Sequence, residues 1–264
     1  MTSTADLTID EMRQALLEAV EPDDPTDSLW DFCDSGLADL VVPELPALRL
    51  EQDPIHKHKD VLAHTIAVTA KTPPDPIVRL AALFHDIGKP ATRSFEHGGV
   101  TFRHHEAVGA KITKKRLRAL EFERRIVNDV AELVRLSGRF KGYADGWSDS
   151  AVRRYARDAG HLLGHLNQLV RCDCTTRNRA KEARLMAHID DLEARIVQLA
   201  RADARAAERP QMDGNAVMAH LGLTGGPMVG KALRFLLEIK RSEGELPQRD
   251  LEHRLDAWWA KNKP

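Results

Sequence analysis

The sequence has few aromatic residues, few cysteines and no long apolar run. Aromatic side chains make up 5% of its 264 residues, whereas 42% of the chain is hydrophobic and 30% is charged. The chain has long stretches rich in alanine, leucine, arginine and glutamate and few runs of β-branched residues. This composition favours an all-helical fold, and the length allows one or two domains. Since no apolar run approaches about 18 residues and the N-terminus has no signal sequence, we expect a soluble, cytoplasmic protein without a membrane segment.

The chain also lacks a charge excess and a disulfide framework. Its formal net charge is −1, so any nucleic-acid-binding surface must be local. Cys172 and Cys174 are separated by a single residue, too close for a disulfide that would stabilise the fold, and Cys33 is distant from both in the sequence. A Cys-x-Cys pair can bind a soft metal, but no second pair exists, so reduced helix residues are the favoured interpretation.

What the chain does contain is a His-Asp pair at the end of an apolar helix, in the run His-Asp-Ile-Gly-Lys-Pro at positions 85–90. The residues before it have the spacing of a buried helical face: Ile77, Leu80, Ala81 and Phe84. We expect Gly88 to end this helix and Pro90 to prevent it from resuming. A buried carboxylate is costly unless it is paired, so His85 and Asp86 should either find partners or bind an ion.

Two further polar residues occupy positions that helical periodicity reserves for apolar ones. His64 lies three residues after Val61 and four before Val68. Asp173 ends a stripe that should be buried, formed by Leu166, Leu169 and Val170. Alone, such a histidine is usually a hydrogen-bonded core residue, and such an aspartate a helix cap or an arginine partner. Four such residues on three helices instead favour a metal site with open positions for water, in which the protein ligands are His64, His85, Asp86 and Asp173.

Two imidazoles and two carboxylates suit one divalent transition metal, namely Mn²⁺, Fe²⁺, Co²⁺, Ni²⁺ or Zn²⁺, better than Mg²⁺ or Ca²⁺. An ion of this kind activates water near neutral pH and neutralises charge on a phosphoryl oxygen. Asp86 could also act as the base for that water. Lys89 could bind a substrate phosphate or could be a solvated surface lysine. The residues alone therefore indicate metal-activated water attacking a phosphate.

The remaining pattern predicts three parts: an N-terminal helical segment (1–50), a central domain (51–206) and a C-terminal helical tail (207–264). A small hairpin is expected at 92–102, and Trp258 and Trp259 are expected to pack rather than to stack on bases. The longer helices are expected at residues 60–71, 75–87, 104–119, 122–137, 149–158, 161–173, 176–204, 228–242 and 247–261.

Several motifs resemble the HD superfamily of metal-dependent phosphohydrolases, whose order is His…His-Asp…Asp. More closely, they resemble the HD-containing half of bacterial CCA-adding tRNA nucleotidyltransferases, particularly the actinobacterial type. The resemblance covers nearly the whole chain and implies an all-α HD-domain bundle. The matching segments are residues 58–65, 83–90, 104–110, 149–155, 173–178, 213–215 and 225–233.

The polymerase head of that family carries a Gly-Ser dipeptide followed by an Asp-x-Asp motif. This chain contains neither. The resemblance therefore implies an HD body without its polymerase, either a stand-alone protein or a fragment, and we expect no nucleotidyltransferase activity from the chain alone.

The resemblance also bears on the number of metals. HD proteins that bind two metals add two histidines between the His-Asp pair and the final Asp. His105 fits the first, whereas the position usually filled by the second, at the end of the stripe Val130, Leu133 and Val134, is Ser137. We expect one tightly held metal and a second site that is weak or absent. His105 would then position substrate or act as a general acid, and His104 should be exposed.

The family implies hydrolysis of phosphomonoesters or phosphodiesters of nucleotides or RNA termini, such as 2′-phosphates and 2′,3′-cyclic phosphates. An alarmone or dNTP hydrolase is less favoured, because the motifs are more similar to those of the tRNA nucleotidyltransferases. The alternative is a catalytically silent, tRNA-binding body of a split or truncated nucleotidyltransferase, with a homodimer or a separate polymerase head as partner. Basic residues that could bind RNA, or be ordinary solvated helix faces, are Lys114, Lys115, Arg118, Arg153, Arg154 and Arg177.

Overall fold

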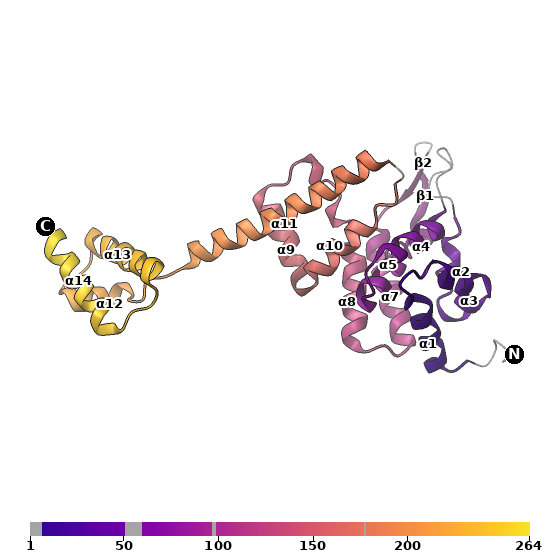
Figure 1. The fold of residues 1–264 in the computed structure, drawn as a ribbon, viewed down its shortest axis with the longest axis horizontal. Helices are drawn as coiled ribbons and strands as arrows, with labels where there is room; N and C mark the ends of the chain where they lie inside the picture. Colours follow the sequence, from indigo (N-terminus) through magenta and orange to yellow (C-terminus); the bar gives the residue numbers. More distant parts are fainter. Residues whose placement is uncertain (1–6, 51–59, 97–98, 177) are drawn as a thin grey trace. The chain divides into compact units, whose positions relative to one another are not determined.

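The computed structural model describes residues 7–50, 60–96, 99–176 and 178–264 and is helical almost throughout, which confirms the all-α prediction (Figure 1). Contacts divide the chain into two compact units, residues 1–196 and 197–264. The helices of the first unit are α1 (Ile9–Val20), α2 (Thr26–Asp34), α3 (Leu37–Val41), α4 (Val61–Lys71), α5 (Pro76–Phe84), α6 (Lys89–Thr92), α7 (His105–Ala119), α8 (Arg124–Leu136), α9 (Asp149–Ala159) and α10 (Leu163–Cys172). The long helix α11 (Arg179–Ala207) contains the boundary between the units.

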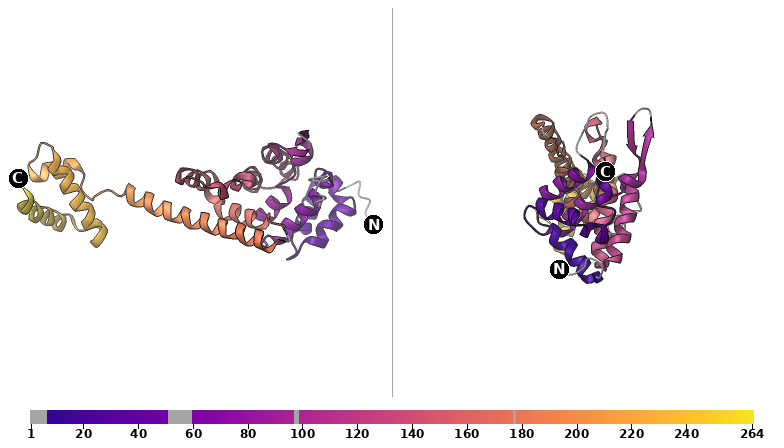
Figure 2. Two further views of the ribbon diagram at one scale, coloured as in Figure 1. Left: turned by 90° about the horizontal axis from the view of Figure 1, so that it is seen from above. Right: turned by 90° about the vertical axis from the view of Figure 1, so that its right-hand side faces the viewer.

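Short elements complete the first unit. Strands β1 (Arg93–Glu96) and β2 (Gly99–Phe102) form the expected antiparallel hairpin, which projects from the helices of this unit (Figure 2). The turn between the strands, predicted at residues 98–99, falls partly outside the described residues. The 3₁₀ helices are η1 (Pro46–Leu48), η2 (Ser137–Phe140), η3 (Tyr143–Asp145) and η4 (Gly160–Leu162).

Helix α5 is the centre of the first unit and packs against α1, α4, α8 and α10. Asp75 caps its first turn by accepting hydrogen bonds from two backbone N–H groups, and Pro76 occupies the first helical position, where its missing N–H costs nothing. The prediction of a single buried face was too narrow: residues 78–84 are all buried, and Ile77 is only half-buried. The helices packed around α5 leave residues 78–84 without a solvent-exposed side.

The chain after α5 differs from the prediction. The helix ends at Phe84, a turn covers residues 85–88, and Pro90 does not prevent helix formation, because it lies in the first turn of α6. Proline is tolerated there since the first N–H groups of a helix have no partner within the helix. His85 and Asp86 therefore lie in a tight connection between two helices rather than in the last turn of one.

This connection depends on close backbone packing at Gly88. A Cβ at this residue would lie 2.2 Å from the His105 carbonyl oxygen and 2.6 Å from the Gly109 nitrogen. Both neighbours are backbone atoms of α7, so they cannot rotate away as a side chain would. The absent side chain of Gly88 is what allows the His85–Asp86 turn to approach α7.

We expect Gly88→Ala to destabilise the first unit by about 3 kcal/mol, because overpacking forces a backbone shift. Denaturant unfolding measures the change. Gly164→Ala is the matched control: it lies in α10 with nothing near its Cβ position, and alanine should slightly stabilise that helix. Equal stability of Gly88→Ala and wild type would contradict the packing argument.

A buried arginine joins the N-terminal helices to α5. Arg79 is 2% exposed, and its guanidinium donates hydrogen bonds to the carbonyl oxygens of Pro73 and of four consecutive residues at the end of α1, residues 20–23. These carbonyls include the terminal ones that a helix leaves unsatisfied. The positive charge also suits the negative end of the α1 dipole.

The second unit is built from α12 (Gly214–Leu221), α13 (Pro227–Glu243) and α14 (Gln248–Asn262). Its core includes Val217, Leu236, Leu251 and Leu255. The Trp258 ring stacks on Phe235 with 5.5 Å between centroids, which agrees with the packing role predicted for it.

Two expectations about composition can be compared with the described residues. All three cysteines are free, as predicted. Among the described helices, none combines the length and the apolar character needed to cross a bilayer. The finer division at residues 50 and 206 stays a prediction.

Candidate metal site

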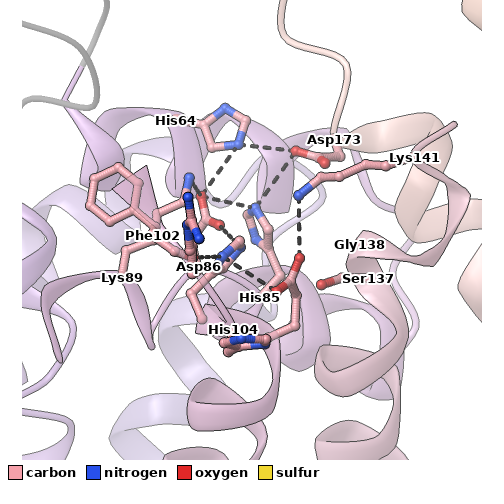
Figure 3. A pocket seen from close by; sticks show the side chains of 13 residues that line it. His64, His85, Asp86, Lys89, Phe102, His104, Ser137, Gly138, Lys141 and Asp173 are labelled. Carbon is pink, nitrogen blue, oxygen red and sulfur yellow. Dashed lines mark hydrogen bonds and ion pairs between the residues drawn. The ribbon is translucent and has the colours of Figure 1, made fainter. Parts of the chain in front are cut away.

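Four predicted ligands converge from three different helix ends (Figure 3). His64 lies in α4, whose first turn is capped by Asp60, His85 and Asp86 lie in the turn after α5, and Asp173 follows the last residue of α10. The shortest contact joins His64 Nε2 and Asp173 Oδ1 at 3.0 Å, and His85 Nε2 lies 3.6 Å from the same oxygen. The donor atoms of His64, His85 and Asp173 all lie within 4.8 Å of one another.

Hydrogen bonds on the far side of each imidazole orient both rings. His85 Nδ1 lies 2.7 Å from the Ala82 carbonyl oxygen and therefore donates to it, and His64 Nδ1 lies 3.0 Å from Thr175 Oγ1. A proton on Nδ1 of His85 leaves the lone pair of Nε2 facing the site, as metal-binding histidines require. His85 Nε2 is buried and has no hydrogen-bond partner among the described residues. An unsatisfied buried nitrogen beside a second imidazole and two carboxylates fits a divalent cation.

Asp86 has a different set of neighbours from the other three. Its Oδ2 lies 3.3 Å from His85 Nε2 and 3.7 Å from His64 Nε2, but accepts a 2.7 Å hydrogen bond from Lys89 Nζ. Lys89 is 5% exposed and lies over the Phe102 ring, so the solvated-surface interpretation of this lysine is wrong. Asp86 thus stands between the histidines and an internal cation.

Asp173 is less buried than its stripe predicted. Its side chain is 42% exposed, because α10 ends at Cys172 and the aspartate points into the cavity rather than into the core. The expectation of a fully buried acid was wrong, whereas its position beside the two histidines agrees with the prediction. Exposure on one side leaves room for a substrate.

The site opens into a cavity of about 480 Å³. His105 faces it, with Nε2 3.6 Å from Asp86 Oδ1 and Nδ1 2.8 Å from the Phe102 carbonyl oxygen, whereas His104 is exposed as expected. Ser137 lines the same cavity, at the position where a second-metal histidine was expected from the family, and donates its hydroxyl to the Val134 carbonyl oxygen.

The charged groups shift one another's protonation. Burial disfavours the charged form of His85, but the carboxylates of Asp86 and Asp173 outweigh it and raise the pKa of His85 to about 9. Burial opposes ionisation of both aspartates, yet the imidazoles, and Lys89 beside Asp86, hold the pKa of each below its usual range. Burial lowers the pKa of His105. Without a metal, protons supply the positive charge that two close carboxylates require.

Lys89, predicted as a site residue, lines the cavity, but its other cations are not among the six basic residues predicted to bind RNA. Arg103 and Lys141 line it, together with Glu106, whose Oε1 lies 3.2 Å from Lys141 Nζ. Of the predicted RNA-binding residues, none of the described ones lines this cavity. Lys114 lines a separate hollow between α7 and α8, Lys115, Arg118, Arg153 and Arg154 are exposed, and Arg177 lies outside the described residues.

Sequence signals existed for two of the missed residues. Glu106 directly follows His105 in a motif already noted, and Lys141 follows the Ser137 position by one helical turn. Arg103 had no such signal, because it is placed by the end of the hairpin. An RNA-binding role for the six predicted residues stays a prediction.

The comparisons with known proteins agree with this geometry. The HD domain family matches residues 61–207. The chain is 34% identical over 236 residues to the CC-adding tRNA nucleotidyltransferase of Thermus thermophilus, and 33% identical over 237 residues to the A-adding tRNA nucleotidyltransferase of Deinococcus radiodurans. These alignments cover 85% and 87% of this chain, but 50% and 53% of the relatives, so the chain spans about half the length of the curated relatives it matches.

These matches confirm the resemblance that the motifs indicated. The family match includes all four converging residues, from His64 in α4 to Asp173 after α10. We conclude that the chain belongs to the HD domain family and is similar, over most of its length, to tRNA nucleotidyltransferases.

Proposed function

We propose that this protein is a metal-dependent phosphohydrolase that cleaves phosphate esters of nucleotides or RNA termini. The observation that carries the proposal is the unsatisfied Nε2 of His85, which faces His64 and Asp173 from a buried ring oriented by the Ala82 carbonyl. In the HD superfamily such a histidine and carboxylate set serves a divalent metal. His64, His85, Asp86 and Asp173 would hold the ion here.

When bound, a divalent ion would supply a Lewis acid that activates water and neutralises charge on a phosphate oxygen. The residues of the chain have their own tasks. Lys89 Nζ donates a hydrogen bond to Asp86 Oδ2 at 2.7 Å and holds that carboxylate in place. Arg103 and Lys141 line the cavity where a phosphate would enter and would attract it by charge.

His105 is suited to accept a proton rather than to donate one. Its Nδ1 donates to the Phe102 carbonyl oxygen, so in the neutral ring Nε2 carries the lone pair. Burial lowers its pKa, which keeps that ring neutral at pH 7. We therefore assign His105 the role of positioning or deprotonating a group beside Asp86, in place of the general acid that the sequence suggested.

The proposal is tested by elemental analysis of the purified protein together with a screen of nucleoside 2′-, 3′- and cyclic phosphates. We expect about one Mn, Fe, Co, Ni or Zn per chain, because Ser137 cannot replace an imidazole at a second site. Activity should disappear on chelation and return with one of these metals. Activity that persists in fully metal-free protein would refute the mechanism.

Metal binding should release protons and weaken as the pH falls. In the metal-free site the pKa of His85 is raised to about 9, so its imidazole is protonated at pH 7 and must lose that proton to bind a metal. Affinity should fall about tenfold per pH unit below 9 from this group alone, and the dependence should level off above 9. Calorimetry in two buffers of different ionisation enthalpy measures the released proton, and no release at pH 7 would contradict this assignment.

A second function is favoured by the similarity to tRNA nucleotidyltransferases: the chain would be a tRNA-binding body without catalysis of its own. A gel shift with tRNA distinguishes the two. Unchanged tRNA binding by a protein that hydrolyses no phosphate ester would favour the binding module. A homodimer or a separate polymerase head, and a cytoplasmic location, remain part of these proposals.

A further inference from the structure

A second cavity adjoins the metal site and is unexplained by the chemistry described so far. It has a volume of about 250 Å³ and lies within the first unit. Ser137, Lys141 and Asp173 line both cavities, so the two lie next to each other along these residues. The far wall comes from η2, η3, α10 and α11, and includes Phe140, Tyr143, Val170, Leu185 and His188.

The far wall is aromatic and held in place by the surrounding structure. The Tyr143 ring stacks on Phe140 with centroids 5.5 Å apart and meets Trp147 edge-on at 5.3 Å. Its hydroxyl donates to Asp191 and accepts from Arg195. His188 faces the same ring at 6.4 Å. The wall is therefore pre-organised and does not need to be ordered by a ligand.

The charges of this cavity are all on the side shared with the metal site. Lys141 and Asp173 lie on that side, and the rest of the described lining carries no lysine, arginine or carboxylate. A molecule that spans both cavities would thus place its anionic group near the histidines and an uncharged, flat group against Val170, Leu185 and His188. Aromatic and apolar walls bind nucleobases by stacking, which contributes about 1–3 kcal/mol per base.

We propose that this second cavity binds the nucleoside part of the substrate, while the phosphate ester lies at His64, His85 and Asp173. The inference rests on the proposed function, since it names which part of a nucleotide each cavity holds. Lys141 stands at the junction. Its side chain is 71% exposed and its Nζ is 3.2 Å from Glu106, so it can turn toward a phosphate oxygen without leaving a buried partner.

The test fills the nucleoside cavity without touching the metal site. Leu185→Trp places a large ring in the cavity from α11, and Ala187→Trp is the matched control because Ala187 is exposed on the same helix. Hydrolysis of adenosine 2′-monophosphate is compared with hydrolysis of glycerol 2-phosphate, which has a phosphate but no base. We expect Leu185→Trp to raise KM for the nucleotide by about tenfold or more, equivalent to loss of one stacking contact, and to leave glycerol phosphate within about twofold.

The outcomes separate this inference from the proposed function. If Leu185→Trp affects both esters equally, or Ala187→Trp has the same effect, the nucleoside assignment is wrong although hydrolysis stands. If wild type hydrolyses neither ester, the proposed function fails, and the cavity is then judged by saturation-transfer NMR with adenosine alone. Adenosine signals lost in Leu185→Trp and kept in Ala187→Trp support the assignment, and no adenosine signal with wild type overturns it.

Discussion

Asp86→Ala should abolish metal content and phosphatase activity together. Asp86 Oδ2 lies within 4 Å of His64, His85 and Lys89, so its removal takes away a ligand and the partner of a buried cation at once. Loss of a residue that only supports metal ligands costs 10–100-fold, so loss of a ligand should cost more than about 100-fold in activity. Metal analysis and ester hydrolysis on the same preparation measure both.

Controls must distinguish the loss of a metal ligand from the loss of the folded structure. Breaking a buried ion pair costs about 3–5 kcal/mol, and Asp86→Ala leaves Lys89 buried and unpaired. The double variant Asp86→Ala/Lys89→Met removes both charges and should recover stability but not activity. Asp256→Ala is the matched control, since Asp256 pairs with His220 at 2.8 Å in the second unit and is 60% exposed. A metal-free, folded Asp86→Ala protein that still hydrolyses the ester would end the proposal.

Arg79→Met should destabilise the first unit by about 4 kcal/mol or more. The variant keeps much of the side-chain volume but removes every donor from the carbonyl oxygens of Pro73 and of residues 20–23. A buried acceptor left without a partner costs about 1–3 kcal/mol, and several are affected here. Arg79 is followed six residues later by His85, so the metal site should loosen with the helix that carries it.

Thermal unfolding measures this effect, with an expected loss of about 10 °C in Tm for a unit of this size. Arg154→Met is the control, because Arg154 is exposed on α9 and its loss should change the Tm by little. The Tm of Arg79→Lys should lie between those of wild type and Arg79→Met, since an ammonium can reach only some of these carbonyl oxygens. A Tm of Arg79→Met equal to that of wild type would show that the buried guanidinium does not hold α1 to α5.

The helices were largely predictable because their caps and periodicity are local. Helix α4 begins one residue after the predicted start at 60, and α11 is shifted by three residues from 176–204. Burial on every side of α5 could not be predicted, since periodicity reports only one face, whereas the other face is covered by helices distant in sequence. Helix α6, which starts at Lys89, was missed because Pro90 was interpreted only as a helix breaker.

His64 and Asp173 could be singled out because each occupies a position in an apolar stripe, and His85 and Asp86 because they directly follow one. The structure brings the donor atoms of His64, His85 and Asp173 within 4.8 Å of one another. Of the cations of the cavity, Lys89 was predicted as a site residue. Arg103 and Lys141 were not, because they follow a hairpin and a 3₁₀ helix whose course depends on tertiary contacts. Lys114, Lys115 and Arg118 do not line the cavity, since a rise of 1.5 Å per residue places Lys114 about 13.5 Å along α7 from His105.

The buried contact between Lys89 and Asp86 bears on whether the chain folds before or after it binds a metal. With an ammonium 2.7 Å from Asp86, the buried carboxylate has a counter-ion within the chain itself, so we expect the first unit to fold without a bound metal. Zinc fingers, by contrast, stay unfolded until their ion arrives. We therefore expect a metal, when bound, to be acquired by a chain that is already folded.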